Sequence, residues 1–205
     1  MLDEHIVKGQ TMLASRFAKP LSEKIKQWVD SLILIQDVLE AWLKCQATYL
    51  YLDPIFSSED IMQQMPDEGV KFRTVHEMWC DVMKLAHAQP LAFPAMRQED
   101  LLERLNEANA ELESIMSSLN AYLETKRLYF PRFFFLSNDE LLEILAETKD
   151  PHRVQKHLSK CFEGIAKLEF NATLDIRAMF SSKGERLEFQ PLPKSEGGRF
   201  INPMS

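Results

Sequence analysis

Glycine is scarce in this sequence, and it contains no motif for binding nucleotide phosphates. Only 6 of the 205 residues are glycine, and no segment matches GxGxxG, or GxxxxGK followed by Ser or Thr. Backbone loops that hold phosphates need glycines at such fixed positions. We therefore expect that this chain neither binds nor hydrolyses ATP and needs no cofactor of its own.

Cysteine is also rare. The three cysteines, Cys45, Cys80 and Cys161, lie far apart, and no two of them have the spacing of metal ligands. An odd number argues against a disulfide framework and indicates a reducing compartment such as the cytosol. Cys45 and Cys161 fall on apolar stripes, so we expect both to be buried structural thiols.

A metal site is not expected. The segment from His76 to Cys80 superficially resembles the zinc motif HExxH, but Cys80 stands at the second histidine position and no third ligand is evident. His152 and His157 are five residues apart, about 140° around a helix, and therefore do not converge on one ion. The sequence favours a partly exposed helical histidine at His76.

The sequence also lacks an excess of positive charge and long apolar runs. The chain has 31 acidic and 24 basic residues, a net charge of −7, and a pI near 5.3. This balance argues against nucleic acid or an anionic membrane as a partner. No apolar run approaches the ~18 residues of a membrane span, and residues 1–17 lack the continuous apolar stretch of a secretory signal.

Acidic pairs open several of the expected helices, among them Glu59–Asp60 and Asp139–Glu140. Acidic side chains in a first turn are favoured by the helix dipole, which explains these pairs without catalysis. No base or nucleophile converges on any of them. We expect a chain that is not an enzyme.

Helical spacing of apolar residues dominates the chain. It predicts long helices over residues 22–51 and 99–127, with the first ended by Asp53–Pro54 because proline disfavours helix in the residue before it. A short helix starts at Ser57–Asp60 and is stopped by Pro66. Another runs from about Asp67 to Gln89–Pro90, and residues 91–97 are predicted to be a loop.

An aromatic run, Tyr129–Leu136, separates the long helices from shorter elements. It is predicted to be a buried extended segment, because the glycines that flank exposed RNA-stacking rings are missing. Ser137 with Glu140 forms a capping box that opens a short helix. Asp150–Pro151 then places Asp at an N-cap and Pro at the first helical position, which starts another helix.

The period changes after Asn171 and predicts a β-hairpin near residues 174–189, with its turn at 181–185. Residues 190–205 are rich in Pro, Gly and Ser and are expected to be loosely structured. The predicted fold is mainly α, an elongated stack of helical bundles with a small C-terminal β-hairpin. Residues 1–189 form the folded domain.

Several long, correctly ordered phrases resemble the linker region of dynein heavy chains, especially the axonemal type. The match runs from about Leu2 to Phe189, and residues 191–205 do not resemble the family's linker. The phrases are Gln46 with Tyr49–Ile61, Lys126–Arg127 with Phe130–Leu145, Thr148–Pro151, Val154–Gln155 with His157–Leu158, and Lys160–Glu163.

This resemblance implies a bent rod of helical bundles that arches over a ring of six AAA+ modules, N-terminal to the ring. ATP hydrolysis in the downstream ring makes the rod bend and straighten. The implied partners are the AAA+ ring and tail of the same heavy chain, dynein intermediate and light chains, and, only indirectly, microtubules. The implied location is the cytoplasm, the cytoskeleton and the axoneme of the cilium.

Two functions are compatible with these observations. The first is a non-catalytic mechanical segment of an axonemal dynein heavy chain, and the second is a free-standing helical scaffold or regulator without motor activity. For the first, we expect bending between residues 128 and 152 while helices 22–51 and 99–127 stay rigid. The family-signature residues and candidate hinge are Phe130, Pro131, Arg132, Phe133, Phe134, Phe135, Leu136, Ser137, Asn138, Asp139, Glu140, Asp150 and Pro151.

Overall fold

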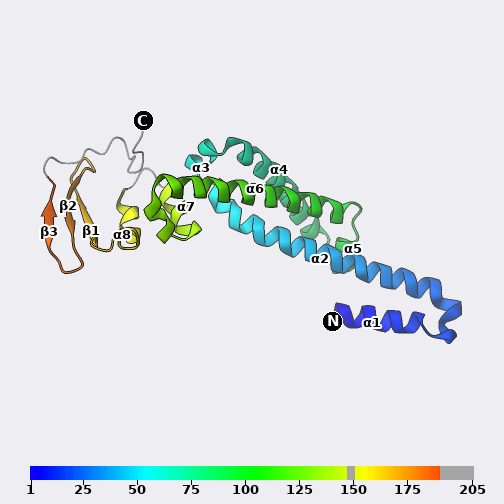
Figure 1. The fold of residues 1–205 in the computed structure, drawn as a ribbon. Helices are drawn as coiled ribbons and strands as arrows, with labels where there is room; N and C mark the ends of the chain where they lie inside the picture. The colour runs from blue at the N-terminus through cyan, green and yellow to red at the C-terminus, as the bar shows by residue number, and fades with distance from the viewer. Residues whose placement is uncertain (147–150, 190–205) are drawn as a thin grey trace. The chain divides into compact units, whose positions relative to one another are not determined.

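Most of the chain is helical, and three short strands form a small antiparallel sheet after the last helix (Figure 1). The computed structural model describes residues 1–146 and 151–189. This arrangement confirms the predicted mainly α fold with a small C-terminal β-hairpin, whereas the expected tail, residues 190–205, lies outside the described residues. No helix in the described ranges combines the length and the apolar character that a membrane span needs.

The chain folds into two compact units. The first comprises residues 1–53 and 67–116. Its aromatic core forms between α2 and α4, where the Tyr49 ring stacks on Phe72 and Trp79 at centroid distances of 5.7 and 5.3 Å. Its elements are α1 (Leu2–Leu13), the 3-10 helix η1 (Arg16–Leu21), α2 (Ser22–Phe56) up to Asp53, α4 (Pro66–Ala88), α5 (Ala92–Met96) and α6 (Leu101–Tyr129) up to Met116.

The regular ladder of apolar residues in α6 faces the protein interior. Leu105, Leu112 and Ile115 are completely buried, and Leu101, Ala108 and Leu119 are nearly so. Spacings of three and four residues keep such side chains on one face of a helix, so this part of the sequence prediction is confirmed.

Three helical segments differ from the prediction. α2 continues through Pro54 to Phe56, because the buried Leu52 and Phe56 hold its last turn in place despite the lost backbone donor. The predicted loop 91–97 contains α5, in which Pro94 lies in the first turn, where a missing N–H costs nothing. α1 was not predicted; it buries Ile6 and Gly9.

The second unit comprises residues 54–66 together with the described residues from Ser117 to Phe189. The hydroxyl of Ser58, just before α3, donates a hydrogen bond to the Ala146 carbonyl at the end of α7 (3.4 Å). Besides the ends of α2 and α6, its elements are α3 (Glu59–Gln64), the 3-10 helix η2 (Pro131–Phe135), α7 (Asn138–Ala146), the 3-10 helix η3 (Pro151–Val154), α8 (Gln155–Cys161), β1 (Lys167–Phe170), β2 (Ile176–Phe180) and β3 (Arg186–Glu188).

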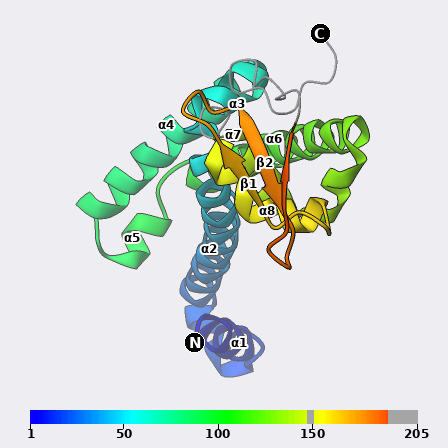
Figure 2. The same ribbon diagram turned by 90° about the vertical axis from the view of Figure 1, so that its left-hand side faces the viewer.

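The sheet has the order β1-β2-β3, with both pairs antiparallel. β2 and β3 form the predicted hairpin, and Gly184 takes the left-handed conformation that its turn requires (φ +85°). β1 was not predicted. Figure 2 shows α8 beside β1, and Ala178 at the centre of β2 is completely buried.

Gly9 allows α1 to pack closely against α2. A Cβ atom at this position would lie 2.4 Å from Cγ2 of Val29, whereas the same atom at Gly164 would meet nothing within 4 Å. Gly9→Ala should therefore loosen α1, although alanine favours an isolated helix by about 1 kcal/mol. Native-state hydrogen exchange should show faster exchange of the α1 amides in this variant.

The matched control is Gly164→Ala, which should leave the α1 amides unchanged. Combining Gly9→Ala with Val29→Ala removes the clash, so the pair should show a coupling free energy within roughly 0.5–3 kcal/mol. Purely additive effects of the two substitutions would contradict close packing at this position.

Candidate functional site

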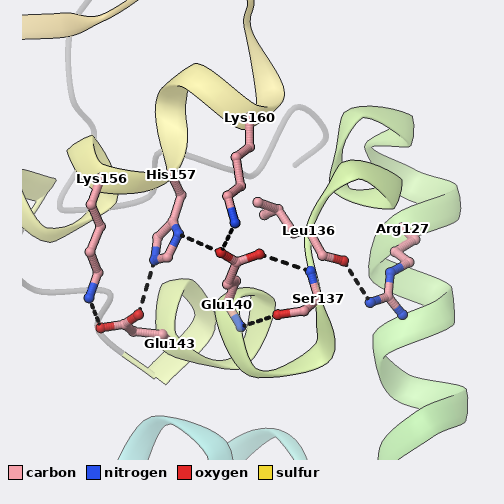
Figure 3. Close-up of polar contacts among 8 residues, drawn as sticks. All are labelled: Arg127, Leu136, Ser137, Glu140, Glu143, Lys156, His157 and Lys160. Carbon is pink, nitrogen blue, oxygen red and sulfur yellow. Dashed lines mark hydrogen bonds and ion pairs between the residues drawn. The ribbon is translucent and has the colours of Figure 1, made fainter.

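The candidate hinge of the sequence lies in the second unit, where α6 gives way to η2, α7 and α8 (Figure 3). We call residues 127–146 and 151–161 the joint. Within them the chain reverses its course through short helices, so side-chain contacts must fix the path that long helices fix elsewhere.

The aromatic run forms the 3-10 helix η2, not the extended segment predicted from its composition. Pro131 opens it, and the Phe133 N–H donates to the Phe130 carbonyl (2.9 Å). With three residues per turn, Phe130, Phe133 and Leu136 share one side. Phe133 is 3% exposed and Leu136 is also buried, whereas Phe134 and Phe135 are 52% and 68% exposed. The run is therefore buried only in part, as expected for at least one of its rings, and the prediction of an extended backbone is wrong.

The capping box at the start of α7 is confirmed. The Glu140 N–H donates to Oγ of Ser137 (3.3 Å), and the Ser137 N–H donates to Oε2 of Glu140 (3.0 Å). Two backbone donors that the first turn of a helix leaves unpaired are satisfied reciprocally. This short contact fixes where α7 begins.

Arg127, in the last turn of α6, holds the far end of the aromatic run. Its guanidinium donates to the Leu136 carbonyl (3.2 Å) and to Oδ1 of Asn138 (2.7 Å). The Asn138 amide in turn donates to Oδ1 of Asn120, which lies about two turns before Arg127 on α6 (3.2 Å). The end of α6 and the start of α7 are thereby tied together across η2.

Arg132 makes the corresponding contact with α8. It donates to the carbonyl of Cys161, the last residue of α8 (2.9 Å), and its guanidinium lies 4.8 Å from the centre of the Phe162 ring. The last carbonyls of a helix lack partners and carry partial negative charge, so a cation is favoured there. The exposed side of η2 thus holds the end of α8.

Charged side chains connect α7 with α8, as Figure 3 shows. Glu143 pairs with Lys156, and Glu140 pairs with Lys160. His157 lies between the two carboxylates and is 5% exposed. Its Nε2 is 3.0 Å from Oε2 of Glu143, and its Nδ1 is 3.8 Å from Oε1 of Glu140. Since a carboxylate only accepts, Nε2 carries the proton that is donated to Glu143.

These contacts shift the acidity of both glutamates. Hydrogen bonds from the Lys160 ammonium and the Ser137 N–H lower the pKa of Glu140 from an ordinary 4.5 to about 2. The pKa of Glu143 is lowered as well, first by Lys156 and then by His157. Both groups are therefore carboxylates over the whole physiological pH range.

The joint gathers most of the predicted residues. Asp139 lies in the first turn of α7, and Pro151 begins η3, but Asp150 lies outside the described residues. The prediction missed Arg127, Glu143, Lys156, His157 and Lys160 as members of the site. A signal was present, because Lys156 and Lys160 are four residues apart and Glu140 and Glu143 three apart, which places each pair on one helix face.

The joint can position helices, and it borders an apolar cavity. The cavity has a volume of about 250 Å³ and lies between η2, α8 and the sheet, where Phe133, Leu158, Phe170 and Ile176 line it. Over residues 1–146 and 151–189, no group of three or more His, Cys, Asp or Glu side chains is placed to hold a metal ion. Cys45 and Cys161 are buried, as predicted.

A family model described as "Dynein heavy chain, N-terminal region 2" matches residues 1–198. The chain belongs to the dynein heavy chain family. The match continues beyond Phe189, the last residue of the resemblance in the sequence. It covers η2, α7 and α8, so the joint is part of the family's N-terminal region.

Named relatives are axonemal dynein heavy chains. The chain is 59% identical to Dynein axonemal heavy chain 12 of Mus musculus over 97% of its length. It is 58% identical to Dynein axonemal heavy chain 3 of Homo sapiens over 92%, and 47% identical to Dynein axonemal heavy chain 1 of Rattus norvegicus over 95%. It spans only 4–6% of the length of these relatives.

The difference in burial predicts that Phe133 and Phe135 of this dynein segment contribute unequally to stability. Phe133→Ala removes a buried ring and should destabilise the chain by about 3–5 kcal/mol. Phe135→Ala removes a largely exposed ring, and the change should stay within about 0.5 kcal/mol. Urea unfolding followed by circular dichroism measures both. Equal losses for the two variants would contradict the 3-10 arrangement of the run.

The low pKa of Glu140 predicts a pH dependence of stability. The group is more acidic folded than unfolded, so its contribution is complete above pH 4.5 and is lost as the pH falls toward 2. Glu140→Gln should therefore lower the melting temperature at neutral pH and flatten its decline between these values. The exposed Glu163→Gln is the control and should keep the parent's slope. An unchanged slope in Glu140→Gln would refute the assignment.

Proposed function

We propose that this chain is a non-catalytic mechanical linker segment of an axonemal dynein heavy chain. It couples ATP-driven changes in the AAA+ ring to microtubule-based ciliary movement. The carrying observation is the joint, which the family's N-terminal region includes and in which short helices are held by directional polar contacts. The match to axonemal relatives supports the axonemal assignment.

Bending is proposed to occur within residues 128–152, while α2 and α6 move as rigid pieces. α6 has 29 residues, whereas α7 and α8 have 9 and 7. A long helix with a buried apolar ladder resists sharp bending, because a kink breaks backbone hydrogen bonds and packing together. Short helices joined by side-chain pairs can exchange partners and leave their own backbone bonds intact.

The apolar cavity beside the joint supports this assignment. Protein interiors are closely packed, and a side chain can change its position only where space is available. The cavity of about 250 Å³ lies against Phe133 and Leu158, so α8 has space in which to repack beside η2. A movement of α8 along α7 would fill part of this space.

The wider assignments follow from the same proposal. The partners are the AAA+ ring and tail of the same heavy chain, with dynein intermediate and light chains in the parent complex and microtubules contacted only indirectly. ATP is bound by the ring and not by this chain. The location is the cytoplasm, the cytoskeleton and the ciliary axoneme.

Distances between spin labels test the position of the bend in a dynein motor that contains this segment. One pair spans the joint, at the exposed positions Glu124 in α6 and Ser159 in α8. This distance should change between nucleotide-free and ATP-analogue-bound states. Cys80 and the accessible cysteines of the rest of the motor are replaced by Ser in this background, so that labels attach only to the introduced cysteines.

The control pair, Glu103 and Glu124, lies on α6 and should keep its spacing in every state. A change within α6, or a constant distance across the joint, would show that the bend is elsewhere. Sequencing the parent transcript tests the coupling role separately. A long reading frame with phosphate loops downstream supports a motor segment, and a short one supports a free-standing scaffold.

A further inference from the structure

Four polar side chains outside the joint form a connected line in the first unit. The Tyr49 hydroxyl lies 3.3 Å from Oδ1 of Asp53 and 2.8 Å from Nδ1 of His76. The other ring nitrogen of His76, Nε2, lies 3.6 Å from Sγ of Cys80. Tyr49 and Asp53 belong to α2, whereas His76 and Cys80 are one turn apart on α4.

The direction of each hydrogen bond follows from the acceptor at one end. The Asp53 carboxylate only accepts, so the Tyr49 hydroxyl donates its proton to it. The Tyr49 oxygen then accepts from Nδ1–H of His76. This tautomer leaves the lone pair of Nε2 facing the Cys80 thiol, which donates S–H to it.

Tyr49 is well suited to this middle position because it stays neutral. Burial, followed by the nearby Asp53 and Cys80 side chains, raises the pKa of Tyr49 to about 12. A neutral phenol can donate to Asp53 and accept from His76 at the same time. The Asp53 carboxylate also lies 3.9 Å from Nδ1 of His76 and therefore stabilises the ring when it becomes a cation.

The other two cysteines have a different environment. Cys45 is completely buried and Cys161 is 6% exposed. Burial raises the pKa of Cys45 to about 11 and that of Cys161 in the same direction. Cys80 is only partly buried, and a nucleophile, a base and a group that orients the base are in hydrogen-bond reach of one another there.

We propose that Cys80 is a modification site that reacts with small disulfides such as glutathione disulfide. Nε2 of His76 takes the thiol proton, and the Cys80 sulfur attacks one sulfur of the disulfide. A new S–S bond forms to Cys80 as the S–S bond of the reagent breaks. The departing glutathione thiolate takes the proton from the imidazolium, so Cys80 is oxidised to a mixed disulfide and one glutathione is reduced.

This modification would change the contact between α2 and α4. A thiol that has become a disulfide no longer donates to His76, and a bulky group then occupies the space beside the ring. The line from Cys80 to Asp53 is a polar connection between these two helices, next to the Tyr49 aromatic stack. Its loss would weaken their association within the first unit.

The test is incubation of the folded 205-residue chain with glutathione disulfide, followed by peptide mass mapping. Cys80 should be modified first, and Cys45 and Cys161 only after unfolding. His76→Gln removes the base and should slow the reaction at Cys80 at least about tenfold, since a positioned base typically contributes 10²-fold or more. Tyr49→Phe keeps the ring but removes the hydroxyl, and should change the pH profile of the rate.

His87→Gln is the matched control, because it removes an exposed histidine from the same helix and should leave the rate unchanged. Circular dichroism verifies that each variant is folded. The proposal is overturned if folded His76→Gln reacts as fast as the parent chain. It is also overturned if Cys80 is modified no faster than the two buried cysteines.

Discussion

The carboxylate of Glu140 connects two parts of the second unit that are separated in the sequence, the start of α7 and the end of α8. One oxygen accepts the Ser137 N–H and closes the cap of α7, while the other pairs with Lys160 on α8. Removing this one group would leave the first turn of α7 without its cap and would break one of the contacts that hold α8 against α7. α8 in turn packs against β1, so this contact is also connected to the sheet.

Local rules in the sequence recovered part of this arrangement. The capping box needs only Ser137 and Glu140 three residues apart, and the α6 ladder needs only apolar residues at steps of three and four. The pairing of Glu140 with Lys160 joins residues 20 apart, so no local pattern specifies it. It depends on how α7 and α8 pack, which the charges on their facing sides could suggest but not establish.

The aromatic run shows a second limit on what composition can predict about structure. Three consecutive phenylalanines favour burial, but hydrophobicity alone does not tell a period of two from a period of three. Pro131, shortly before the three phenylalanines, was the available signal, since its fixed φ suits the first residue of a helical turn. Backbone bonding into η2 then sends Phe134 and Phe135 outward and keeps Phe133 in the core. α1 escaped prediction for a related reason: its burial depends on Gly9, which is a poor helix former in isolation.

The joint combines two kinds of contact with unequal resistance to movement. Exposed ion pairs such as Glu143 with Lys156 contribute little to stability, because water replaces either partner readily. Withdrawing the Phe133 ring from its apolar surroundings exposes a large apolar surface and is far more costly. A bend in this region would therefore exchange the charged pairs between α7 and α8 while Phe133 stays in place. On the proposed function, Phe133 is the pivot, and the charged side chains select which of the packed arrangements around it is occupied.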